Sequence, residues 1–227
     1  MTRTAQDHVR EATQMFGDGD ERVLFAAAQL FREKGFAGTT VREIAAAAKM
    51  LPGSLHYRFP SKDVILVELI KQGVKRAITT MRGLTVNEPD PIERVRLCLR
   101  AHLELLCGGD DSLYVLLFDW RSLPPGARQG VERERGRYEK FWDALLLEAH
   151  ASGKARPMLD LELVRHFGFG CINWVATWYR LGGDRTPAQI ADTLWRFLAY
   201  GLIHESARPS DLDTHFAALQ AASFSGG

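Results

Sequence analysis

The sequence predicts an all-α protein, and three observations support this fold class. Apolar residues recur at intervals of three and four along nearly the whole chain, as on one face of an α-helix. No segment shows the strict alternation of apolar and polar residues that is typical of a half-buried strand. Clusters of proline and glycine, such as Pro-Pro-Gly and Gly-Gly-Asp, divide the chain into segments of helix length.

The composition is that of an ordinary globular protein. The chain has 227 residues, of which 46% are hydrophobic and 25% are charged, and this excludes collagenous, low-complexity and wholly disordered classes. No apolar run approaches the roughly 18 residues that span a bilayer, and the first residues are too polar for a signal peptide. We therefore expect a cytoplasmic protein with no membrane partner.

The cysteines predict neither a metal site nor a disulfide. Cys98, Cys107 and Cys171 are odd in number and form no closely spaced pair. We expect them to be small buried apolar residues, and we expect no metal and no cofactor.

The first two helices are predicted from their ends. One helix is expected at about 21–34, with Asp20 as its N-cap and Gly35 as its stop. A second, short helix is expected after Thr39 and Thr40, because Glu43 follows Thr40 at the spacing of a capping box.

Further helices follow at similar signals. Residues 52–58 form a short helix that ends at Phe59-Pro60, and Ser61 opens the next one, which runs to about Arg82. Beyond the proline pair at 89 and 91 the helices become longer, and they are expected at about 91–107, 112–121, 125–152, 160–181 and 187–205.

These signals suggest two domains with short tails. We expect a helical N-terminal domain at 18–82 and a larger helical domain at 83–208, with tails at 1–17 and 209–227. The formal net charge is only +1, yet residues 32–82 hold 10 Lys and Arg against 4 Asp and Glu. A polyanion, if one binds, would therefore bind the N-terminal domain.

The three N-terminal helices also carry a motif. Two short helices joined by a tight turn near 48–51, with the first helix packed across both, form a helix-turn-helix. The string from Thr39, TTVREIAAAAKMLPGSLHYRFPSKDVIL, resembles the DNA-binding signature of the TetR family of bacterial regulators, and the match runs from Glu21 to Ile70. The resemblance implies binding to double-stranded operator DNA.

The residues of this motif suit DNA in their own right. Gly53 lets backbone amides approach a phosphate closely, and hydroxyls and amides at 39–40 and a cation at 62 suit the flanking phosphates. By resemblance, some contact the DNA backbone and others lie at or near bases. The predicted DNA-binding residues are Thr39, Thr40, Arg42, Pro52, Gly53, Ser54, His56, Tyr57, Arg58 and Lys62.

Taken singly, these residues have simpler explanations, since Tyr57 could pack, His56 could be solvated and Lys62 could be a surface charge. Their joint spacing favours DNA binding. The chain departs from the family pattern at the turn, where Lys49 replaces the usual Gly and Leu51 replaces the usual Ser or Thr N-cap. Pro52 stands where Lys or a similar polar residue is usual, so the base preference of relatives cannot be carried over to this chain.

The resemblance also implies a homodimer, because a single helix-turn-helix reads only a few base pairs. In the family the last two long helices of each chain form a four-helix bundle between protomers. The matching apolar residues are Leu163, Phe167, Leu194, Phe197 and Leu198, with Ile172 also available; periodicity alone leaves open which of them face the partner and which the core.

The middle helices are expected to enclose a small hydrophobic effector. Aromatic residues at helical spacing are typical of a core, but Asn173 and Arg121 lie among bulky apolar neighbours, where polar groups need partners. The segment from Cys171 resembles a TetR subgroup whose effectors are acyl-coenzyme A thioesters. The predicted ligand-binding residues are Phe118, Arg121, Trp142, Phe169, Asn173, Trp174, Trp178 and Arg180.

The resulting hypothesis is a ligand-responsive repressor that leaves a palindromic operator when its effector binds, with an activator as the minority form. One alternative is a DNA-binding regulator without a small-molecule sensor, which would lack a cavity. A second is an all-α enzyme that uses Asp119 with His102 or His166; against it, no nucleophile, metal or phosphate-loop motif is present.

Overall fold

We describe residues 19–108, 111–118, 123 and 125–208 of a computed structural model. Within these residues the regular elements are helices, apart from one isolated β-bridge between Ala155 and Ile203. This confirms the all-α fold class. No helix in the described part of the chain is long and apolar enough to cross a membrane.

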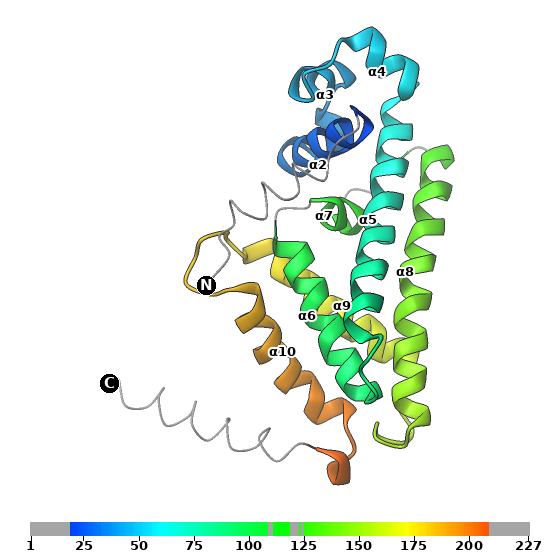
Figure 1. Cartoon of the computed structure of the whole chain (residues 1–227), viewed down its shortest axis with the longest axis vertical. Coiled ribbons are helices and arrows are strands. Elements are labelled where there is room, and N and C mark those ends of the chain that lie inside the picture. Colours follow the sequence, from blue (N-terminus) through cyan, green and yellow to red (C-terminus); the bar gives the residue numbers. More distant parts are fainter. Residues whose placement is uncertain (1–18, 109–110, 119–122, 124, 209–227) are drawn as a thin grey trace.

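Three helices form one end of the elongated molecule (Figure 1). They are α2 (Gly19–Gly38), α3 (Val41–Ala47) and α4 (Pro52–Arg58). Their apolar residues meet in a common core that includes Val23, Ile44 and Leu55, each fully buried. Burial of these side chains fixes the angle at which the two short helices leave the first.

Local signals set the ends of these helices as expected, with one correction. Thr40 and Glu43 form the predicted capping box of α3, and Gly35 (φ 73°, ψ 162°) interrupts the helical geometry of α2. Asp20 does not cap α2; it lies in the first turn, and its carboxylate accepts a hydrogen bond from Arg58. The sequence could not show this contact, because the two residues are 38 positions apart.

Helix α5 (Lys62–Thr85) connects the two halves of the molecule, as Figure 1 shows. Its N-terminus is capped by Ser61, as predicted, whose hydroxyl accepts from the Val64 amide. The helix packs against α2 and against α6 (Pro91–Cys107), α7 (Ser112–Phe118) and α8 (Pro125–Ala151). Helix α5 is therefore a single continuous helix that contacts both halves of the molecule.

The last two long helices are α9 (Leu161–Trp178) and α10 (Pro187–Leu202). Both end about three residues earlier than the sequence suggests, α9 at the extended backbone of Tyr179 and α10 at that of Ile203. Ile203 lies opposite Ala155 in the β-bridge. Its own N–H still donates to the Ala199 carbonyl of the helix, and the hydrogen bonds of the bridge run from the Arg156 amide to the Leu202 carbonyl and from the His204 amide to the Lys154 carbonyl.

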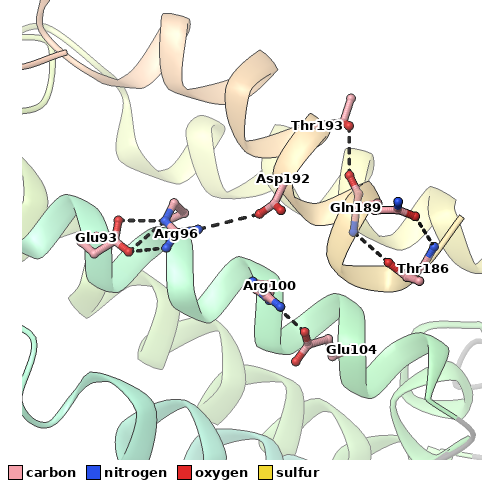
Figure 2. A network of polar contacts seen from close by, with 8 residues as sticks. All are labelled: Glu93, Arg96, Arg100, Glu104, Thr186, Gln189, Asp192 and Thr193. Carbon is pink, nitrogen blue, oxygen red and sulfur yellow. Dashed lines mark hydrogen bonds and ion pairs between the residues drawn. The ribbon is translucent and has the colours of Figure 1, made fainter. Parts of the chain in front are cut away.

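Figure 2 shows the ion pair that joins α6 to α10, together with the polar contacts within each helix. Arg96 of α6 bonds Glu93 on its own helix, and its guanidinium lies 3.8 Å from the Asp192 carboxylate of α10. The start of α10 has its own capping box, formed by Thr186 and Gln189. Exposed ion pairs of this kind contribute little stability individually, so the packing of apolar side chains holds α6 against α10.

Candidate DNA-binding surface and ligand cavity

Helix α4 presents an exposed face at the end of the molecule. Its only buried residue is Leu55, whereas Pro52, Gly53, Ser54, His56, Tyr57 and Arg58 are exposed. Tyr57 is 91% exposed. A large aromatic side chain that packs on nothing in its own protomer suits contact with an outside molecule.

Gly53 has no internal reason to be glycine. Its φ is not in the left-handed region, and a Cβ built there meets no atom within 4 Å. Glycine in a helix costs about 1 kcal/mol relative to alanine. The absence of a side chain would let an external group, such as a DNA phosphate, approach the backbone of α4 closely, and this would explain the glycine.

The two threonines before α3 have different roles. The Thr40 side chain is exposed at the N-cap, where it donates to Glu43 and lies within reach of solvent. Thr39 is 1% exposed, and its hydroxyl bonds the carbonyl oxygens of Leu30 and Gly35. The expectation that the Thr39 hydroxyl faces a phosphate is therefore corrected: it holds the end of α2 in place.

Lys62 also has an internal role that the motif did not reveal. Its ammonium donates to the carbonyl oxygens of Phe36 (2.5 Å) and Thr39 (2.7 Å) and lies 4.3 Å from the centroid of the Phe36 ring. These carbonyls lie at the end of α2, where helical acceptors are otherwise left open. Lys62 thus ties the start of α5 to the turn before α3, whatever else it contacts.

Two arginines flank the exposed face. Arg42 of α3 is exposed. Arg58, at the end of α4, donates to Asp20 at 2.5 Å, and both side chains are 40–50% exposed. The pair links α4 to the start of α2, so Arg58 orients the helix as well as carrying charge to its surface.

The turn before α4 bears both departures seen in the sequence. Lys49 has φ 53°, in the left-handed region that glycine adopts more readily. Leu51 is the N-cap and makes no side-chain hydrogen bond to α4. Both features reduce the local stability of the turn that presents α4.

An open, largely apolar cavity of about 400 Å³ lies in the other half of the molecule, between α6, α8, α9 and α10. Its volume is within the range of small-molecule sites. Trp142 and Phe169, both predicted to bind ligand, line it together with Val95, Leu99, Leu146, Ile172, Trp195 and Leu198.

Among the described residues, the charged side chains that line this cavity are Asp160 and Arg165, and the charge of Arg165 is paired. Arg165 is 8% exposed, with its Nε 2.6 Å from the Asp143 carboxylate and its Nη1 3.9 Å from that of Glu139. Because two carboxylates already surround this guanidinium, it does not offer a net positive charge to an anionic ligand. The cavity therefore favours apolar groups.

A buried aromatic cluster lies behind the cavity wall. His102 of α6 is 1% exposed, and its Nδ1 lies 2.7 Å from the Tyr138 hydroxyl of α8. Its ring also neighbours those of Trp142 and Phe169, with centroids 6.2 and 6.1 Å away. Burial lowers the pKa of His102 to about 4, so the ring is neutral at physiological pH.

Sequence reasoning considered His102 only for the enzyme alternative. Its position in the apolar stripe of α6, between Leu99 and Leu106, is the sequence signal that could have marked His102 as a buried residue. Among the described residues, its ring lies against three aromatic rings and near the Asn173 amide.

Other predicted ligand-binding residues lie away from the cavity. Trp174 and Trp178 are 67% and 49% exposed, and with Leu163 and Phe167 they form a stripe along α9. Phe197 of α10 is exposed too, whereas Leu194 and Leu198 are half-buried. We name the set Leu163, Phe167, Trp174, Trp178 and Phe197 the α9–α10 stripe. Leu163 and Phe167 of this stripe also line the cavity, whereas Trp174 and Trp178 do not.

The remaining predicted residues are placed as follows. Arg180 is exposed just beyond α9, and Asn173 is half-buried near His102. Phe118 ends α7, but its side chain, like the whole of Arg121 and Asp119, lies outside the described residues.

Comparison with known proteins matches both halves of the chain. Residues 23–69 match the family model described as bacterial regulatory proteins, tetR family. Residues 88–202, just over half of the chain, match that of the tetracyclin repressor-like C-terminal domain.

Individual relatives agree with this match. The repressor KstR2 of Mycobacterium tuberculosis is 29% identical over 185 residues, covering 81% of this chain and 92% of that protein. The fatty acid metabolism regulator protein of Bacillus subtilis is 27% identical over 158 residues, 69% and 81% of the two chains.

Two solved structures share the fold. The ketosteroid transcriptional regulator KstR2 of Mycobacterium tuberculosis has a TM-score of 0.72 at 26% identity, over 83% of this chain and 97% of that one. The regulator FadR of Bacillus subtilis, solved with stearoyl-CoA, has a TM-score of 0.70 at 25% identity, over 81% and 98%. With its helix-turn-helix, its helical second half and both family models matched, this chain belongs to the TetR family of bacterial transcriptional regulators.

Proposed function

We propose that this protein is a homodimeric repressor that binds a palindromic operator through α4 and releases it when a hydrophobic acyl thioester enters the cavity. The observation that carries the proposal is the pairing of an exposed α4 face with an apolar cavity in the same chain. The cavity also favours this function over a DNA-binding regulator without a sensor.

The exposed aromatic residues of α9 and α10 support the dimer. Leu163, Phe167, Trp174 and Trp178 recur every three to four residues or a multiple of that, and so share one side of α9. An apolar strip of this size is unusual on a monomer surface. A second copy packed on the α9–α10 stripe would bury it and set the spacing of two α4 helices for adjacent half-sites.

The effector class is suggested by the cavity and by the relatives. FadR of Bacillus subtilis was solved with stearoyl-CoA, and KstR2 is named a ketosteroid regulator. In this chain, the apolar lining suits an acyl group. The resemblance to the acyl-coenzyme A subgroup implies Arg180 and Arg121 as partners of the coenzyme phosphates, and of these Arg180 is exposed in the structure while Arg121 lies outside the described residues.

Contacts between the two halves provide a route for coupling. Arg32 of α2 forms an ion pair with Asp111, the residue before α7, and lies 4.7 Å from the centroid of the Tyr114 ring in α7. A ligand that prefers one arrangement of the larger half would shift α2, and α4 with it, through this contact and through α5.

The test is a mobility-shift experiment with the purified full-length protein. An operator is first obtained by selection from random duplex DNA, and decanoyl-, palmitoyl- and stearoyl-coenzyme A are then titrated into the complex, with free coenzyme A as the control. The proposal expects an enriched palindrome and release by at least one thioester but not by coenzyme A alone. Operator binding that no thioester or free fatty acid alters would favour the regulator without a sensor.

A further inference from the structure

Polar atoms without partners gather beside the apolar cavity. Within the described part of the chain, His102 Nε2, Trp142 Nε1 and Asn173 Oδ1 are buried and lack a partner in good hydrogen-bond geometry, although Trp142 lies close enough to the Tyr138 hydroxyl to lower its pKa. His102 and Trp142 are themselves 1% and 4% exposed. A buried polar atom left without a partner costs about 1–3 kcal/mol, so several in one cluster need an explanation.

These three residues come from three helices and meet around Phe169. Trp142 lines the cavity, and its ring contacts that of His102. Phe169 also lines the cavity and packs edge-on against Trp142, with centroids 5.7 Å apart. On α6, His102 follows the cavity residue Leu99 by one turn of helix. The polar cluster therefore adjoins the cavity wall rather than lying in a separate part of the core.

The cluster is suited to an uncharged group. In the part of the chain that the structure describes, the side chains of His102, Tyr138 and Trp142 contact one another, Phe169 and Asn173, and none of these groups is charged. Burial keeps the His102 ring neutral by lowering its pKa, and it raises the pKa of the Tyr138 phenol, which stays protonated. An ion placed here would find no compensating charge, so its desolvation would oppose binding.

The donors and acceptors of the cluster indicate which kind of ligand group it can bind. The indole of Trp142 can only donate. If the Tyr138 hydroxyl donates to Nδ1 of His102, the imidazole proton lies on Nε2, and the cluster offers two donors. In the other tautomer Nε2 accepts. An oxygen satisfies either case: a carbonyl accepts from two donors, and a hydroxyl both accepts and donates.

We infer that His102 and Trp142 form the polar end of the ligand site and select an apolar ligand that carries an uncharged keto or hydroxyl oxygen on its buried part. The inference rests on the proposed function, because it assumes that the cavity binds the effector. It adds a preference that the apolar lining alone cannot produce, namely for an oxygenated acyl group over a plain hydrocarbon.

The competing explanation is a purely structural network. The Asn173 amide partly offsets the lowered pKa of His102, so it lies near the ring. Small rotations that pair Asn173 Oδ1 with His102 Nε2, and the Trp142 indole with the Tyr138 hydroxyl, would satisfy the whole cluster internally. In that case His102 and Trp142 would support the fold and would not distinguish one ligand from another.

The experiment compares matched ligands by calorimetric titration of the full-length protein. The probes are decanoyl-coenzyme A and its analogues with a keto or a hydroxyl group on the penultimate carbon. We expect at least one analogue to bind about tenfold more tightly than decanoyl-coenzyme A, which corresponds to about 1.4 kcal/mol. The keto and hydroxyl arms show which tautomer of His102 the site uses.

Variants then locate the preference. His102→Phe and Trp142→Phe should each bring the ratio of the affinities for the oxygenated analogue and decanoyl-coenzyme A close to one, whatever their effect on the affinity for decanoyl-coenzyme A itself. Trp195→Phe is the control, because Trp195 lines the same cavity but lies outside the cluster. If His102→Phe does not fold, Trp142→Phe and His102→Gln carry the test.

Two outcomes overturn the inference in distinguishable ways. Equal affinity for all three probes, or a preference that survives both cluster variants, removes the inference but leaves the proposed function intact if the thioesters still release DNA. Failure of every thioester to bind and to release DNA removes both.

Discussion

Replacing Gly53 by alanine should change folding and DNA binding in opposite directions. Gly53 lies in α4 with no atom within 4 Å of a built Cβ, and its φ is not left-handed. Alanine therefore fits without strain and reduces the conformational freedom of the unfolded chain. We expect the free energy of unfolding to rise by about 0.5–1 kcal/mol.

The expected gain is measurable. For a chain of this size, 1 kcal/mol corresponds to roughly 2–4 °C in Tm, followed by circular dichroism. Operator affinity, followed by mobility shift, should fall at the same time, because the added methyl group keeps the backbone of α4 away from the DNA.

A matched control separates the two effects. Gly83 of α5 is also exposed and helical, and its built Cβ likewise meets no atom within 4 Å. Gly83→Ala should raise Tm to a similar extent and leave operator affinity unchanged. A Gly53→Ala protein that is less stable, or that binds the operator as tightly as the wild type, would refute the reasoning.

The remaining predictions concern the N-cap of α4, the protonation of His102 and the ion pair between Arg32 and Asp111. Leu51→Ser supplies the acceptor that α4 lacks at its N-cap and should raise the free energy of unfolding by about 1 kcal/mol in urea titrations; no change would mean that water already serves this end of the helix. Stability should fall as the pH drops from 6.5 towards 4, because the unfolded chain gains a proton that buried His102 (pKa about 4) does not accept; the full effect is roughly 3 kcal/mol. His102→Gln should reduce this pH dependence, and an identical profile would contradict it. Arg32→Gln and Asp111→Asn should each lessen the loss of operator affinity that decanoyl-coenzyme A causes, while the affinity for decanoyl-coenzyme A without DNA stays within about twofold. Because the two residues act through one contact, the double variant should weaken this coupling no more than either single variant does.

The helices could be predicted because their signals are local. The capping box of Thr40 and Glu43, the cap at Ser61 and the break at Gly35 all act within a few residues, and each is found in the structure. The motif at 39–70 is local in the same way. Its residue types and spacings predicted the exposed face of α4 without any knowledge of tertiary contacts.

The roles that sequence reasoning missed depend on long-range contacts. Lys62 bonds carbonyls 23 and 26 residues away, and Arg58 bonds Asp20 across 38 residues. His102 meets Tyr138 across 36 residues. Periodicity shows which side of a helix is apolar, but it does not show whether that side meets a cavity, a partner or the core. For this reason Trp142 and Trp174 appeared equivalent in the sequence, although one is buried beside the cavity and the other is exposed.

The central claim is that α4 binds duplex DNA, and Tyr57→Ala tests it most directly. Because Tyr57 is 91% exposed, its removal should leave Tm unchanged, and the full-length variant should remain folded. We predict that its affinity for the selected operator, measured by mobility shift at fixed salt, falls at least tenfold while thioester binding is retained. A folded Tyr57→Ala protein that binds the operator as tightly as the wild type would contradict the account.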